Sequence, residues 1–206
     1  MRVVARTPPI LNNGVCDLTR PSARIAAMDK ARRLQLIEQY KHGVNAVLVA
    51  VSIHSDEEFD RHPTHVGWSA RELIHHLADI VHPASRDWSA RQVVHHLADA
   101  EMMEAIHLRR MLAENTPVLH QWDTERYAER LHYDRPIALA LEAFKATALV
   151  NIELLERLQD QEWKREGNQE RPWPLSVENW LEEKVAHIHQ RLMQILNAIG
   201  SAGAKP

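Results

Sequence analysis

The sequence predicts an all-α protein: an antiparallel four-helix bundle with a short extra helix from a duplicated segment. Apolar residues recur at helical spacing in four long segments, and no segment alternates as a half-buried strand would. Six glycines occur among 206 residues, well below the average of roughly 7%. This shortage disfavours turn-rich β-sandwiches and glycine-looped nucleotide folds. The length fits one domain that buries about 70% of its unfolded surface.

Three parts of the chain are distinguished by composition. Residues 1–27 are rich in arginine and contain Pro8, Pro9 and Gly14, so we expect a disordered N-terminal leader. Residues 28–200 carry the bundle pattern, and residues 201–206 are expected to form a disordered tail.

The first helix is predicted from Asp29 to about Val51. Its apolar face consists of Leu34, Ile37, Tyr40, Val44, Val47, Leu48 and Val51. Ser55 and Glu58 then form a capping-box pattern that opens a short helical turn.

A tandem repeat follows, with residues 62–81 as the first copy and 82–101 as the second. In each copy a serine precedes Glu72 or Gln92 by three residues, which is the capping-box pattern of a helix start. The first copy is ended by Pro83 and predicts the short extra helix. The second copy continues to about Asn115, so we expect it to form the second helix of the bundle.

The rest of the chain predicts one short helix and two long ones. The short helix covers about Thr124 to Leu131, and the third bundle helix runs from Pro136 to about Leu158. Ser176 is predicted to cap the last helix, which ends near Gly200. Its apolar stripe consists of Leu181, Val185, Ile188, Leu192, Ile195 and Ile199.

Charge, hydropathy and cysteine content exclude several classes of protein. Lysine and arginine number 25 against 28 aspartate and glutamate, which removes the electrostatic case for a nucleic-acid partner. The longest nearly apolar run, residues 44–53, is half the roughly 20 residues that a membrane span needs. The single cysteine, Cys16, cannot form an internal disulfide. We therefore expect a soluble cytoplasmic protein with no membrane partner.

Fourteen histidines are the unusual feature of the composition. At 100° per residue, His96 lies at the flank of the second helix's apolar stripe, whereas His95 faces away from it. On the last helix His187 and His189 lie on opposite flanks, so they cannot chelate one ion. A flank histidine is either a structural group satisfied by a hydrogen bond or a metal ligand built between facing helices. Glu101 lies on the apolar stripe, where it is a partner or base for such a site, or else a rim residue.

The segment from Trp88 to Glu101, followed by Arg109 to Glu114, resembles the second helix of the DinB-like superfamily, in particular its YfiT-like branch. This resemblance implies a four-helix bundle that is often dimeric and that holds nickel or zinc through three histidines. One histidine comes from the second helix, and two, spaced four residues apart, come from the fourth. Several members of the superfamily are transferases that use a low-molecular-weight thiol, and others are described as metal-dependent hydrolases.

Carried over by residue, the resemblance makes His96 and His187 metal ligands and puts Arg191 at the third position. A guanidinium has no lone pair for a metal, so the three-histidine site is degenerate. Water, a carboxylate or another histidine are the candidates for completing it. Two functions remain open: a hydrolase or thiol-dependent transferase that uses zinc or nickel on a small-molecule substrate, and a non-catalytic, stress-associated binding or dimerising bundle without metal. In either case the resemblance implies a homodimer.

Overall fold

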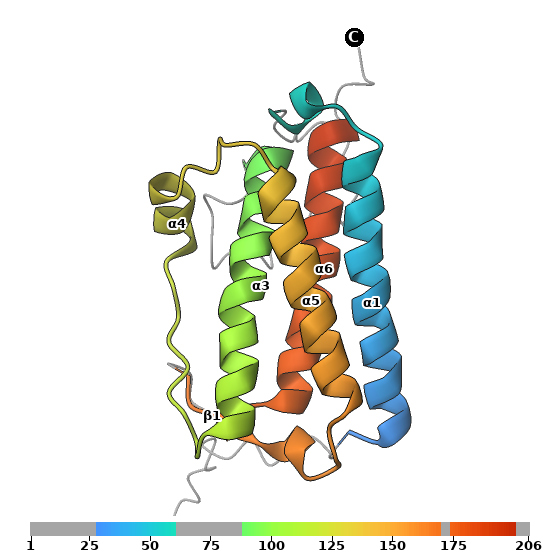
Figure 1. Ribbon diagram of the computed structural model, residues 1–206, viewed down its shortest axis with the longest axis vertical. Helices are drawn as coiled ribbons and strands as arrows, with labels where there is room; N and C mark the ends of the chain where they lie inside the picture. Colours follow the sequence, from blue (N-terminus) through green and yellow to red (C-terminus); the bar gives the residue numbers. More distant parts are fainter. Residues whose placement is uncertain (1–27, 61–87, 170–173, 201–206) are drawn as a thin grey trace, which may run out of the picture.

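A computed structural model describes residues 28–60, 88–169 and 174–200. Four long helices, α1 (Lys30–Ser52), α3 (Ala90–Ala113), α5 (Ala138–Glu156) and α6 (Val177–Gly200), pack side by side (Figure 1). The four-helix bundle predicted from the sequence is therefore confirmed. The predictions for residues 1–27, for the short extra helix in 62–81 and for residues 201–206 lie outside the described residues.

Short elements connect the long helices. They are the 3-10 helices η1 (Asp56–Asp60) and η4 (Glu162–Lys164), the helix α4 (Thr124–Arg130), and the two-residue strands β1 (Glu166–Gly167) and β2 (Leu175–Ser176). The strands pair antiparallel just before α6. These two strands are not predictable from the sequence, because two residues per strand are too few to show alternation.

The capping residues lie where the sequence predicts helix starts. Asp29 accepts a hydrogen bond from the backbone of Arg32 at the start of α1. Ser89 and Gln92 form a complete capping box at the start of α3. Ser176 Oγ accepts from the backbone nitrogen of Asn179 at 3.2 Å at the start of α6. These caps satisfy backbone donors that a helix leaves without partners in its first turn.

The order of the helices around the bundle is α1, α6, α3, α5, so α1 and α3 lie at diagonal corners. Helices α1 and α6 run in one direction, and α3 and α5 run in the other (Figure 1). The reason is the connection 114–137, which includes α4 and returns the chain along the outside of the bundle to the end where α3 began. Each long helix therefore has one parallel and one antiparallel neighbour.

The core is one apolar cluster to which all four long helices contribute. On α1 the expected apolar face is wrong at one position, because Leu34 is 54% exposed while Leu36 is buried. Helix α1 packs against both α5 and α6. Leu36 is two residues after Leu34 and is therefore rotated about 200° from it around the helix. None of the helices in the described residues combines the length and apolar character needed to cross a bilayer.

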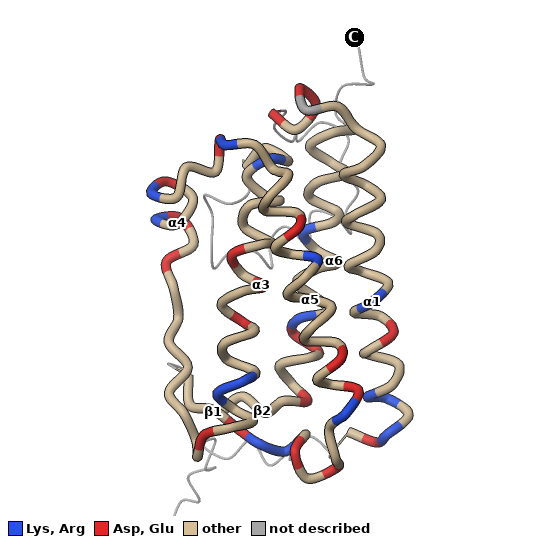
Figure 2. The backbone as a smooth tube through the Cα atoms, viewed as in Figure 1, with Lys and Arg blue, Asp and Glu red and all other residues tan. Residues whose placement is uncertain are grey.

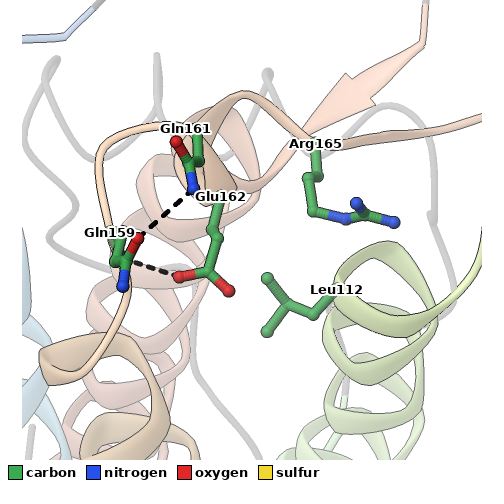
Figure 3. Close-up of a pocket in the computed structure, with 5 residues that line it drawn as sticks. All are labelled: Leu112, Gln159, Gln161, Glu162 and Arg165. Carbon is green, nitrogen blue, oxygen red and sulfur yellow. Dashed lines mark hydrogen bonds between the residues drawn. The ribbon is translucent and has the colours of Figure 1, made fainter.

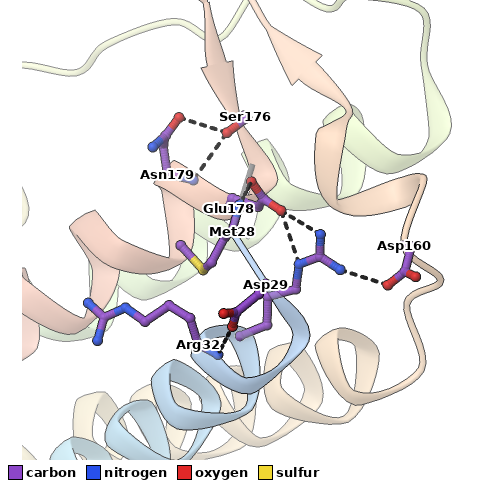
Figure 4. Close-up of polar contacts among 8 residues, drawn as sticks. Met28, Asp29, Arg32, Asp160, Ser176, Glu178 and Asn179 are labelled. Atoms are coloured by element: carbon purple, nitrogen blue, oxygen red, sulfur yellow. Dashed lines mark hydrogen bonds and ion pairs between the residues drawn. The ribbon is translucent and has the colours of Figure 1, made fainter. Parts of the chain in front are cut away.

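Charged residues of both signs are interspersed along the helices, but one end of the bundle has fewer of them (Figure 2). Helix α1 carries no charged residue after Lys41, and α6 carries none after Arg191. At the opposite end, the beginnings of α1 and α6 are joined by a buried ion pair in which Arg33 donates to Glu178 at 2.7 Å. Glu178 also accepts the backbone N–H of Met28 at 3.1 Å (Figure 4). This pair holds the two parallel helices in register.

Candidate metal centre

The antiparallel packing of α3 and α6 brings His96 and His187 together. Their Nε2 atoms are 3.1 Å apart, and the rings meet edge to face with centroids 5.2 Å apart. His96 is buried and His187 is half-buried. The two residues that the resemblance names are thus neighbours in space although 90 residues separate them in the chain.

Trp88 fixes the orientation of the His96 ring. It is buried at the residue before the Ser89 cap, and its ring packs edge-on against His96 with centroids 5.2 Å apart. It also contacts Tyr133 at 6.1 Å. Trp88 is therefore a packing residue at the helix start.

The geometry of the two imidazoles fits two ligands of one ion. Nitrogen ligands lie about 2.0 to 2.1 Å from zinc, so two ligands at a tetrahedral angle are about 3.4 Å apart. The observed Nε2 to Nε2 distance of 3.1 Å is close to this value. The two nitrogens also come from different helices, as in the metal sites that bundles build between facing helices.

Arg191 does not fit as the third ligand. It lies one turn after His187 on α6 and is buried, and its Nε donates to His187 Nε2 at 3.2 Å. Its Nη1 donates to Gln194 Oε1 at 2.7 Å. A guanidinium offers donors only and is always charged. Over the described ranges no three histidine, cysteine or acidic side chains form a metal cluster, so these residues supply two donors.

The helical wheel places His95 facing away from the apolar stripe of α3, yet this residue is not exposed. Its side chain is completely buried, and the connection before α5 packs against it. Its Nε2 donates to the carbonyl oxygen of Arg135 at 2.9 Å, and its ring stacks on Tyr133. Burial lowers the pKa of His95, so the ring stays neutral. A helical wheel describes one helix alone and therefore cannot show a loop that covers it.

Glu101 is also not a rim residue, because its side chain is completely buried. Tyr40 OH and Asn151 Nδ2 donate to its Oε1, the latter at 2.8 Å. Lys184 Nζ lies 2.7 Å from its Oε2. Burial and the charge of Glu101 raise the pKa of Tyr40, which keeps the phenol protonated as a donor. We call Tyr40, Glu101, Asn151 and Lys184 the central polar cluster.

Lys184 was not predicted as the partner of Glu101, although its position in the sequence indicates burial. It lies about 40° from Ile188 on the helical wheel, on the apolar stripe of α6, just as Glu101 lies on the stripe of α3. A lysine and a glutamate that both lie on apolar stripes predict a buried pair, because either charge alone is costly inside a protein.

A surface pocket lies at the other end of α3 from His96. It has a volume of about 420 Å³ and is lined by Leu112, Gln159, Gln161, Glu162 and Arg165 (Figure 3). Arg165 Nε donates to the carbonyl oxygen of Met111 at 2.7 Å, and its Nη2 donates to that of Glu114 at 2.6 Å. The pocket is therefore separate from the two histidines.

Comparison with known proteins identifies the fold. A solved structure of YfiT from Bacillus subtilis, described as "a probable metal-dependent hydrolase with an unusual four-helix bundle topology", aligns with a TM-score of 0.69 over 87% of this chain and 93% of that one. The chain has a YfiT-like fold. At 23% sequence identity, this similarity shows a shared fold and nothing further about the chain.

A second similar protein, from Oceanobacillus iheyensis, bears the name "putative metal-dependent hydrolase". It is 35% identical over 92 residues, which are 45% of this YfiT-like chain and 42% of that protein. The match thus spans less than half of the relative's length. No protein-family model matches the sequence.

Proposed function

We propose that this chain is a metal-dependent hydrolase that acts on a small-molecule substrate, with a zinc or nickel ion held weakly by His96 and His187. The observation that carries the proposal is the 3.1 Å separation of the two Nε2 atoms. The names given to two similar proteins support the same class of reaction. A divalent ion held by these two residues would supply a nucleophile for hydrolysis, because such ions lower the pKa of water to about 7.

The chain's own residues prepare the two nitrogens. Packing against Trp88 fixes the ring of His96, so little rotamer freedom is lost on binding. Both imidazoles must be neutral and carry their proton on Nδ1, because Nε2 has to offer its lone pair. Arg191 opposes binding, since its Nε–H occupies the lone pair of His187 and its charge repels a cation.

The contact between Arg191 and His187 favours a second candidate function. In this alternative the guanidinium replaces the metal permanently, and the bundle is a non-catalytic protein that binds an anionic ligand beside Arg191. Arginine suits such a role because its planar fork matches carboxylate and phosphate groups. The two candidates differ in whether the wild-type protein binds zinc at all.

Calorimetric titration with zinc chloride and nickel chloride tests the proposal. The wild type should bind one ion weakly, and His96→Ala and His187→Ala should each abolish binding. His189→Ala is the matched control, because His189 lies on the same helix but is exposed and on the opposite flank. It should bind like the wild type. Absence of binding by the wild type, together with inorganic phosphate binding that Arg191→Met removes, would establish the anion-binding alternative.

Hydrolysis of 4-nitrophenyl acetate in the presence of zinc provides the test of activity. Zinc should accelerate the reaction for the wild type and for His189→Ala, but not for His96→Ala. Addition of glutathione or bacillithiol tests the thiol-dependent transferase that the resemblance also implies. Transfer of the thiol to an electrophilic substrate, dependent on His96, would replace the hydrolase assignment.

A further inference from the structure

Three polar contacts join α3 and α6 at successive levels. His96 meets His187, Glu101 meets Lys184 at 2.7 Å, and Trp180 Nε1 donates to Glu104 Oε2 at 2.7 Å. The positions on α3 rise while those on α6 fall, as an antiparallel pair requires. The histidine pair is therefore one contact of a ladder, and the central polar cluster is the next.

Residues from all four long helices take part in the middle contact. Glu101 comes from α3 and Lys184 from α6, while Tyr40 of α1 and Asn151 of α5 both donate to Glu101 Oε1. Arg109 in turn donates to Asn151 Oδ1 at 2.8 Å. Lys184 is only 3% exposed, so sliding α3 along α6 would leave a buried ammonium and a buried carboxylate unpaired. Every alternative register is thereby disfavoured.

We propose that Glu101 and Lys184 are positioning residues that set the register of α3 against α6 and so hold the Nε2 atoms of His96 and His187 within reach of one ion. A shift of one residue along a helix moves a side chain by 1.5 Å and rotates it by 100°, and a shift of one turn moves it by 5.4 Å. Either shift separates the two nitrogens. The inference rests on the proposed metal site for its purpose, but the positioning itself is measurable without metal.

Nuclear Overhauser contacts between the two imidazole rings provide that measurement. The ring centroids are 5.2 Å apart, so histidine-labelled wild-type protein should show the contact with no metal added. The decisive variant is the double substitution Glu101→Leu with Lys184→Met, which replaces the buried pair by apolar side chains of similar size. The double substitution leaves no buried charge unpaired. Tyr40 and Asn151 lose their acceptor, and each donor left without one lowers the stability of the fold. The double variant should fold and remain helical but lose the contact between the rings.

A matched control removes a different buried pair. Arg33→Met with Glu178→Leu eliminates the ion pair between α1 and α6 and leaves the α3 to α6 ladder intact. This control should keep the contact between the imidazoles. Retention of the contact at wild-type intensity in the folded Glu101→Leu, Lys184→Met variant would overturn the positioning role, whatever the protein binds.

Zinc affinity gives the second readout. In an Arg191→His background, the Glu101→Leu, Lys184→Met pair should weaken zinc binding by about 10- to 100-fold, the range typical of residues that orient metal ligands. The Arg33→Met, Glu178→Leu pair should not change it. If Arg191→His binds no zinc, the metal proposal fails, and the ring contact alone decides the register proposal.

Discussion

Arg191→His should convert the pair of histidines into a tight zinc site. In the wild type, the guanidinium Nε lies 3.2 Å from the nitrogen that a metal would need. A divalent ion about 5 Å from the guanidinium charge is repelled by about 6 to 7 kcal/mol at an effective dielectric of 20. Outward rotation of the side chain relieves part of this repulsion. The substitution removes the repulsion and adds a third imidazole one turn after His187.

The expected gain in zinc affinity is on the order of 10³-fold, since each 1.4 kcal/mol corresponds to a factor of ten. Arg191→Met separates the two causes, because it removes the charge without adding a donor. Outward rotation of Arg191 relieves all but about 1.4 kcal/mol of the repulsion, so this variant should gain about tenfold. His96→Ala in the Arg191→His background should abolish the gain. Calorimetric titration of the wild type and these three variants measures the four affinities. No gain in Arg191→His would refute the conclusion that these helices meet at a metal, and tight binding by the wild type would mean that another residue completes the site.

Three further predictions concern the stability of the bundle. Arg33→Met leaves the buried Glu178 carboxylate without its main partner and should lower the free energy of unfolding by about 3 to 5 kcal/mol in urea denaturation; a loss below about 1 kcal/mol would contradict the burial of the pair. Ser89→Ala removes the capping box and should cost about 1 kcal/mol in the same assay, whereas an unchanged midpoint would show that the cap is dispensable. Burial alone would raise the pKa of Glu104, but the neighbouring His107 and Lys184 hold it below its usual value. The ionised Glu104 carboxylate therefore stabilises the fold at neutral pH, and this stabilisation is lost as the pH falls below about 4.3. Glu104→Gln should make the free energy of unfolding less dependent on pH in this acidic range. An unchanged pH dependence would contradict the lowered pKa.

The four helices were predictable because their signals are local. Capping residues such as Ser89 and Ser176 and the apolar spacing of α3 and α6 define helix starts and buried faces without knowledge of the partner helix. The sequence predicted an antiparallel bundle, and two helices do run in each direction. It did not predict that each long helix has one parallel neighbour, because this depends on the path of the connection 114–137. The error at Leu34 has a similar origin, since the width of a buried face depends on how many helices pack against it.

The candidate site was predictable only in part. Helical phase placed His96 and His187 at the flanks of their stripes, and the resemblance to a known superfamily paired them. Phase could not reveal that a loop buries His95, because the covering residues are about 40 positions away in the chain. Lys184 could have been predicted as the partner of Glu101, because it lies on the apolar stripe of α6. A buried charge pair is recognised, however, only when both helices are considered together.

X-ray absorption at the zinc edge most directly tests whether His96 and His187 bind the same ion. The wild-type protein, at a concentration high enough to hold one equivalent of zinc, should give scattering from two imidazole ligands at about 2.0 to 2.1 Å. His96→Ala should abolish binding and with it the scattering from two imidazoles, whereas His189→Ala should leave that scattering unchanged. A spectrum with fewer than two imidazoles in the wild type, or one that His96→Ala does not alter, would contradict the assignment of this pair as a metal centre.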